Sequence, residues 1–152
     1  DDLVRTVNKG KKVWFCGHSL GAAMATIMAS RCMFYASVPN PEELYTYGSP
    51  RVGWRKYVKS LGVVHHRWVN NNDIVTRVPL SIMGYVHHGE EHYMNAFGNV
   101  RKSTGWQRFK DRMRGMWMGL KQGKIDNFSD HGMNFYIANL EMYASGKENS
   151  QR

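Results

Sequence analysis

Near its start, the chain passes from a predicted strand through a glycine-flanked turn directly into a predicted helix. Residues 13–16 form an apolar run with the length and the β-branched and aromatic content of a buried strand. Residues 22–35 are rich in Ala and Met at helical spacing, and Pro39 and Pro41 end that segment. The turn between them reads Gly17-His18-Ser19-Leu20-Gly21. Small residues at both ends of such a turn let a strand bend abruptly into a helix and hold the serine hydroxyl out at the bend.

Strands and helices continue to alternate along the rest of the chain. Further strands are expected at residues 44–47, 63–69 and 85–94. Helices are expected at residues 3–7, 54–61, 103–120 and 132–145. Alternation of this kind favours an α/β fold with a parallel sheet. Because no repeat, low-complexity block or linker interrupts the pattern, we interpret residues 1–152 as a single domain.

The composition supports an ordinary globular core. A chain of 152 residues, 42% of them hydrophobic, can bury a core without a disulfide staple. The two cysteines, Cys16 and Cys32, lack the spacing of a metal site, so we expect small buried hydrophobic residues, no disulfide pair, and no metal or cofactor. The longest uncharged apolar run, residues 20–30, is shorter than the roughly 20 residues that cross a bilayer. The first residues do not resemble a signal peptide, and both a secreted and a cytoplasmic location stay open.

Basic residues outnumber acidic residues, with 21 Lys and Arg against 12 Asp and Glu. They are scattered apart from a denser stretch at residues 101–124, and no nucleic-acid-binding motif accompanies them. We therefore interpret them as a solvated basic face and expect no nucleic-acid partner. The stripe of Trp and Met from Trp106 to Leu120 predicts either a helix packed on the sheet or a surface that enters a lipid interface.

The serine of the turn is a candidate nucleophile. A serine hydroxyl reacts only when a neighbouring base takes its proton, so Ser19 requires a histidine and an orienting acid. Of the seven histidines, His131 alone lies in a predicted loop, just before the last helix, and we predict that it is the base. His18 lies inside the turn, where we expect a packing or hydrogen-bonding role. The others are expected to be structural histidines of strands: His65, His66, His87, His88 and His92.

Four aspartates compete for the role of the acid. Asp73 follows the third predicted strand at its carboxyl end, the edge where parallel sheets place their ligands. Its rivals are Asp111, in a predicted helix, and Asp126 and Asp130, in or beside the loop of His131. We prefer Asp73, with Asp130 as the main alternative. A further alternative is that Asp73, which follows three asparagines, only caps a turn.

Five sequence blocks occur in a fixed order along the chain. They are Gly-His-Ser-Leu-Gly-Ala-Ala (17–23), Tyr-Thr-Tyr-Gly-Ser-Pro-Arg-Val-Gly (45–53), Asn-Asp-Ile-Val-Thr-Arg-Val-Pro (72–79), Gly-Tyr-Val-His-His-Gly-Glu-Glu (84–91) and Asp-His-Gly-Met-Asn-Phe-Tyr (130–136). Together they resemble the fungal-type, or class 3, triacylglycerol lipase family. The resemblance extends from about residue 11 to the end of the chain.

This resemblance implies an α/β-hydrolase-like fold, a mostly parallel sheet with helices on both faces. It also implies a lipase that cleaves acylglycerol esters through an acyl-serine intermediate, with Ser19 as nucleophile, Asp73 as acid and His131 as base. The Leu20 backbone N–H would be one oxyanion donor, and Gly17, His18 and Gly21 would form the nucleophile elbow. A phospholipase A1, a short-chain esterase or a catalytically weak lipid-binding fragment stays open as an alternative.

The chain departs from the family pattern at its start. Only sixteen residues precede Gly17, whereas the family places early strands there, with the second oxyanion donor and the lid. We therefore expect the N-terminal strands to be missing. Removal of one oxyanion donor typically lowers turnover by about 10²–10³-fold, so weak activity is expected of the chain alone. The strand at 13–16 would present an unpaired edge, and we expect self-association through it.

Overall fold

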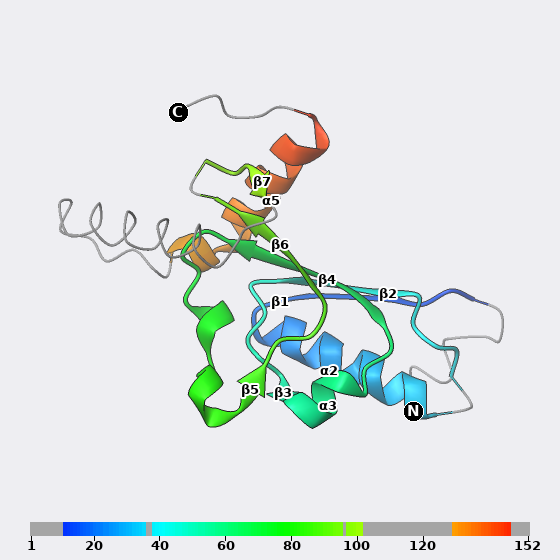
Figure 1. The fold of residues 1–152 in the computed structure, drawn as a ribbon. Helices are drawn as coiled ribbons and strands as arrows, with labels where there is room; N and C mark the ends of the chain where they lie inside the picture. Colours follow the sequence, from blue (N-terminus) through cyan, green and yellow to red (C-terminus); the bar gives the residue numbers. More distant parts are fainter. Residues whose placement is uncertain (1–10, 36–37, 96, 102–128, 147–152) are drawn as a thin grey trace.

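A five-stranded sheet organises the computed structural model, which describes residues 11–35, 38–95, 97–101 and 129–146 (Figure 1). Its strand order is β1-β2-β4-β6-β7. The strands are β1 (Trp14–His18), β2 (Glu43–Tyr47), β4 (Val64–Asn70), β6 (Glu90–Met94) and β7 (Val100–Arg101). The first four run parallel and β7 runs antiparallel to β6, which confirms the expected mostly parallel sheet. Within the described residues β1 is an edge strand, while association through this edge stays a prediction.

Helices lie on both faces of this sheet, as expected. Figure 1 shows α2 (Leu20–Phe34) and α3 (Arg55–Lys59) below the sheet and α5 (Met133–Ala144) above it. Successive side chains of a strand point to opposite faces. In β2, Leu44 accordingly packs in a cluster with residues of α2, whereas the Tyr47 ring lies 6.2 Å from the Tyr136 ring of α5.

The core between α2 and the sheet is built from small and branched side chains. Its buried members are Ala25, Ala29, Leu44 and Val63, with Phe15 and Met33 packed against them. Alanines on the inner face of α2 let the helix axis come close to the strands, and Ala29 and Leu44 are fully buried. This packing holds α2 against β1 and β2.

The expectation of one strand over residues 85–94 is wrong. Residues 85–86 form β5 (Tyr85–Val86), which pairs antiparallel with β3 (Gly53–Trp54) in a separate two-stranded sheet. The break falls at Gly89, whose φ is +83° and whose added Cβ would lie 2.4 Å from the His65 carbonyl oxygen. His87 and His88 therefore lie in a loop and not on a strand. Strand β7 had no counterpart among the expected elements.

Short 3₁₀ helices occupy the loops, at η1 (Val75–Arg77), η2 (Ser81–Met83) and η3 (Ser129–His131). The helices expected at residues 3–7 and 103–120 lie outside the described residues, as does the stripe from Trp106 to Leu120. Of the helices that the structure describes, none has the length and apolar character of a membrane span.

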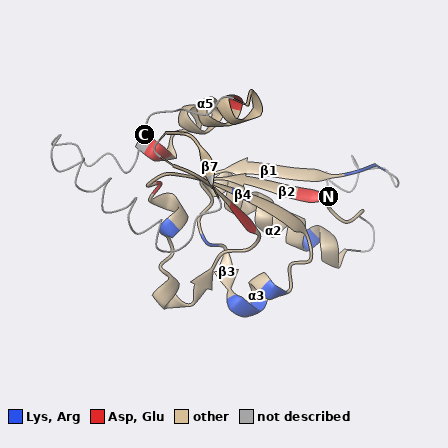
Figure 2. Ribbon diagram, turned by 45° about the horizontal axis from the view of Figure 1, so that its top comes forward, with Lys and Arg blue, Asp and Glu red and all other residues tan. Residues whose placement is uncertain are grey.

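The cysteines only partly follow the sequence interpretation. Cys32 is buried, which raises the pKa of its thiol, but Cys16 is exposed on the edge strand, so the expectation of two buried cysteines is wrong for Cys16. Both are free thiols. Figure 2 shows basic residues on separate elements, including α3, and acidic residues on β2 and β6.

Candidate active site

The turn from β1 into α2 holds Ser19 in a strained backbone conformation. Its φ is +58°, in the region that favours glycine, and its N–H donates a hydrogen bond to the Tyr47 carbonyl. A Cβ added at Gly17 would lie 2.3 Å from the Gly21 carbonyl oxygen, so only glycine fits there. At Gly21, by contrast, an added Cβ meets no described atom within 4 Å outside its own helix and chain neighbours. Of the two glycines of this turn, only Gly17 is therefore required by the close packing of the backbone.

His131 joins Ser19 to Asp73 from a distant part of the chain. Its Nε2 lies 2.7 Å from Ser19 Oγ, and its Nδ1 lies 3.0 and 2.9 Å from the two Asp73 carboxylate oxygens. Because a carboxylate only accepts hydrogen bonds, Nδ1–H donates to Asp73 and Nε2 is left to accept the Ser19 hydroxyl proton. The three side chains are thus placed as nucleophile, base and acid are in a serine hydrolase.

The Asp73 carboxylate is buried and surrounded by donors. Asp73 lies in the loop that follows β4, at the carboxyl edge of the sheet, and only 1% of its surface is exposed. Besides the His131 ring, it accepts a hydrogen bond from the Val75 N–H at 2.9 Å and one from the Tyr136 hydroxyl at 2.7 Å. These donors offset the cost of removing the negative charge from water.

Tyr136 is a site residue that the sequence analysis included in the last helix and in the last of the five blocks without assigning it a role. Its hydroxyl accepts the Asn70 N–H at 3.0 Å and donates to Asp73, so it joins β4 to the acid. Burial, followed by the nearby Asp73 charge, raises the pKa of Tyr136 far above its ordinary value, which keeps the hydroxyl protonated and donating. A tyrosine five residues after His131, on an otherwise apolar helix face, is the signal that could have revealed it.

His18 and Gly48 complete the surroundings of His131. His18 Nε2 lies 2.8 Å from the His131 carbonyl oxygen and its ring stacks on the His131 ring at 4.6 Å, consistent with a packing and hydrogen-bonding role. At Gly48, whose φ is +57°, an added Cβ would lie 2.7 Å from Asp73 Oδ2 and 3.0 Å from His131 Nδ1. Gly48 was not singled out from the sequence, although it belongs to one of the five blocks.

Asp130, the main rival for the acid, points elsewhere. Its Oδ2 accepts hydrogen bonds from the Asn71 side chain at 2.9 Å and from the Asn72 N–H at 3.2 Å. It therefore joins the loop of His131 to the loop of Asp73 through these two hydrogen bonds. Asp111 and Asp126 lie outside the described residues.

Three of the other histidines have structural partners. His65 lies between Thr46 Oγ1, at 2.8 Å, and the His88 ring, at 3.1 Å. His88 in turn contacts the Leu61 carbonyl, and His87 contacts the Thr76 carbonyl at 2.7 Å. Burial lowers the pKa of His65 and of His87 to about 3, so both are neutral structural groups near pH 7.

Comparisons with known proteins agree with this geometry. Residues 1–83 match the model of the family described as lipase (class 3). The Vibrio cholerae toxin TseL is 32% identical over 146 residues, which cover 93% of this chain and 20% of that protein. A secreted mono- and diacylglycerol lipase A of Penicillium cyclopium is 36% identical over 115 residues, or 68% of this chain and 36% of that protein.

The structure also resembles a solved structure, with 33% sequence identity and a TM-score of 0.53. That structure is described as a triacylglycerol lipase whose catalytic centre is formed by a serine protease triad. That match covers 60% of this chain and 36% of the other. The chain thus spans between 20% and 36% of the length of these three proteins. Since the family model matches 83 of its 152 residues, the chain belongs to the class 3 lipase family.

Proposed function

We propose that the protein is a serine carboxylic-ester hydrolase that cleaves acylglycerol esters, with Ser19 as nucleophile, His131 as general base and Asp73 as orienting acid. The observation that carries this proposal is the position of the His131 ring, within hydrogen-bond distance of Ser19 Oγ on one side and of Asp73 on the other. The family, and the relative described as a mono- and diacylglycerol lipase, support the class of substrate.

Acylation begins with the Ser19 hydroxyl. Its Oγ attacks the ester carbonyl carbon while His131 Nε2 takes the hydroxyl proton, and the carbonyl π electrons move onto oxygen to form a tetrahedral oxyanion. When the intermediate collapses, the bond to the leaving alcohol breaks and the His131 imidazolium gives its proton to that alcohol. Asp73 stabilises the imidazolium between these two steps and keeps its ring oriented.

Deacylation repeats the sequence with water. His131 Nε2 takes a proton from a water molecule as the water oxygen attacks the acyl-Ser19 carbonyl carbon. Collapse of the second tetrahedral intermediate breaks the bond to Ser19 Oγ, returns the proton to Oγ and releases a carboxylic acid. Each cycle thus consumes one ester and one water and leaves the three side chains in their starting protonation states.

The start of α2 supplies an oxyanion donor. Leu20 is the first residue of that helix, where backbone N–H groups have no acceptor within the helix, and the helix dipole places positive partial charge at this end. The Leu20 N–H is therefore the proposed donor to the developing negative charge, as in other elbows of this type.

Exposed apolar side chains beside Ser19 support a lipid substrate. Leu20 and Met24 lie one turn apart on α2, and 70% and 63% of their surfaces are exposed. An acyl chain bound along Leu20 and Met24 would remove their apolar surface from water beside Ser19. We propose that the protein meets its substrate at a lipid interface through this end of α2.

The test compares hydrolysis of diacylglycerol, phosphatidylcholine and a soluble butyrate ester by the wild type and by the Ser19→Ala and Ser60→Ala variants. Ser60 is a matched control, since its exposed hydroxyl donates a hydrogen bond to the Tyr57 carbonyl at the end of α3, outside the group of Ser19, Asp73 and His131. We expect diacylglycerol to be cleaved by the wild type and by Ser60→Ala but not by Ser19→Ala.

Other outcomes separate the alternatives. Cleavage restricted to the butyrate ester would indicate a short-chain esterase, and cleavage of phosphatidylcholine would indicate a phospholipase A1. Binding of lipid vesicles with no hydrolysis of any ester would replace the enzyme proposal with a lipid-binding function. Equal activity of Ser19→Ala and wild type would refute the assignment of the nucleophile.

A further inference from the structure

A second group of potential ligands lies on the sheet, away from the three proposed catalytic residues. It consists of His66 on β4 and of Glu90 and His92 on β6. Parallel pairing sets His66 opposite Glu90, and Glu90 and His92 share one face of β6 because they are two residues apart. The pattern of one histidine beside a Glu-x-His strand is therefore a product of strand register, which sequence spacing alone does not reveal.

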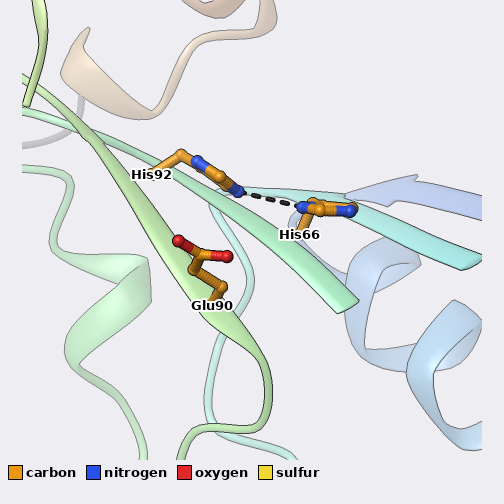
Figure 3. A group of neighbouring side chains, drawn as sticks. All are labelled: His66, Glu90 and His92. Carbon is orange, nitrogen blue, oxygen red and sulfur yellow. Dashed lines mark hydrogen bonds between the residues drawn. The ribbon is translucent and has the colours of Figure 1, made fainter. Parts of the chain in front are cut away.

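The donor atoms of these three residues converge. His66 Nδ1 and His92 Nε2 lie 3.0 Å apart, and one donor atom from each of the three residues falls within 4.8 Å of the others. Figure 3 shows the two rings turned toward each other, with the Glu90 carboxylate beside them. Glu90 is exposed and both histidines are half-buried, so the cluster is open to solvent.

Aromatic neighbours fix both imidazole rings. The His66 ring stacks on Tyr45 of β2 with ring centroids 5.0 Å apart, and the His92 ring stacks on Trp68 of β4 at 4.7 Å. Ligands whose rotamers are locked by packing lose little freedom when an ion binds. The geometry of the nitrogen pair is thus set before any ligand arrives.

Two imidazole nitrogens and one carboxylate oxygen are a donor set that suits zinc. With Zn–N distances of about 2.0–2.1 Å, two nitrogens of a tetrahedral zinc site lie roughly 3.3 Å apart. The 3.0 Å separation of His66 Nδ1 and His92 Nε2 needs only a small opening to reach that value, and the exposed Glu90 side chain can rotate inward. Calcium and magnesium prefer all-oxygen sites and fit this set poorly.

We propose that His66, Glu90 and His92 form a zinc-binding site, with a water molecule as the fourth ligand. A bound ion would link β4 to β6 and so stabilise the folded chain by an amount that rises with the logarithm of the free zinc concentration above the Kd. The competing description is a simple hydrogen bond between the two imidazoles. That bond has no need of Glu90, whereas a metal site loses a ligand when the carboxylate is replaced.

The experiment is a calorimetric titration of Zn²⁺ into the chain after treatment with a chelator and desalting. We expect one ion per chain in the wild type and an affinity at least about tenfold weaker in Glu90→Gln, in His66→Ala and in His92→Ala. Added zinc should raise the midpoint temperature of thermal unfolding of the wild type, and it should raise that of Glu90→Gln much less.

Two control variants exclude other sites. Glu141→Gln removes a carboxylate of α5 outside the cluster, and His131→Ala removes the imidazole that could bind zinc beside Asp73. Both should keep the affinity of the wild type. Wild-type affinity in Glu90→Gln, or no binding to the wild type at about 1 mM zinc, would overturn the proposal. If a histidine variant fails to fold by circular dichroism, Glu90→Gln decides the question, because Glu90 is exposed.

Discussion

Replacement of Tyr136 by Phe tests whether the acid must be held by the last helix. The substitution removes one hydroxyl that donates to Asp73 at 2.7 Å and accepts the Asn70 N–H at 3.0 Å. A hydrogen bond to a charged group contributes about 1.5–3 kcal/mol, and a buried N–H left without an acceptor costs about 1–3 kcal/mol. We therefore expect the free energy of unfolding to fall by about 3 kcal/mol in urea denaturation.

The same substitution should slow the reaction, because the carboxylate that orients His131 loses one of its donors. We expect kcat to fall about tenfold, which corresponds to about 1.4 kcal/mol, with little change in KM. The matched control is Tyr143→Phe on the same helix, whose side chain is 55% exposed and should change stability by less than about 0.5 kcal/mol. A Tyr136→Phe variant that is less stable but keeps the kcat of Tyr143→Phe would refute a positioning role.

Three further predictions concern the elbow, the acid and the dependence on pH. Gly17→Ala should unfold at a lower denaturant concentration than the wild type, because the new methyl group would clash with the backbone of Gly21. Gly21→Ala should unfold near the wild-type concentration, because its methyl group meets no such atom. Equal effects of the two substitutions would contradict this. Asp73→Asn should lower kcat by about 10⁴-fold, whereas Asp130→Asn should lower mainly stability; the reverse pattern would favour Asp130 as the acid. His65 has a folded pKa of about 3 against 6.5 unfolded, so its contribution to the free energy of unfolding is present above pH 6.5 and is lost as pH falls toward 3. Denaturation at pH 7 and at pH 5 should therefore show a loss of stability that is about 2 kcal/mol smaller in His65→Gln than in the wild type, while the buried His87, whose pKa is also about 3, contributes in both. An equal loss in the two proteins would contradict this.

Local patterns were sufficient to predict the parts of the site that depend on neighbouring residues. The strand, turn and helix around Ser19 follow from apolar content, glycine and alanine within about two dozen residues. The position of His131 just before a helix also followed from the sequence, and the structure places its ring between Ser19 and Asp73. In each case the deciding forces act within one element and its adjacent loop.

Features that depend on distant pairing could not be predicted from the sequence. Tyr136 reads as one more apolar position of a helix, because its partners Asp73 and Asn70 are more than 60 residues away. The sequence predicted one continuous strand at 85–94 because its side chains favour strand. In the structure its first part pairs with residues 53–54, and the chain bends at Gly89, where the backbone lies close to His65 of β4. The convergence of His66 with His92 likewise requires the register of β4 and β6.

Labelling with a fluorophosphonate tests the central claim most directly, since the reagent reacts with a serine only when a base activates its hydroxyl. The wild type, Ser19→Ala, Ser60→Ala and His131→Ala should be labelled in parallel, and the modified peptide identified by mass spectrometry. We predict modification of Ser19 alone in the wild type and in Ser60→Ala, and none in Ser19→Ala or His131→Ala. Labelling that is absent from the wild type, or that persists unchanged in Ser19→Ala, would contradict the account.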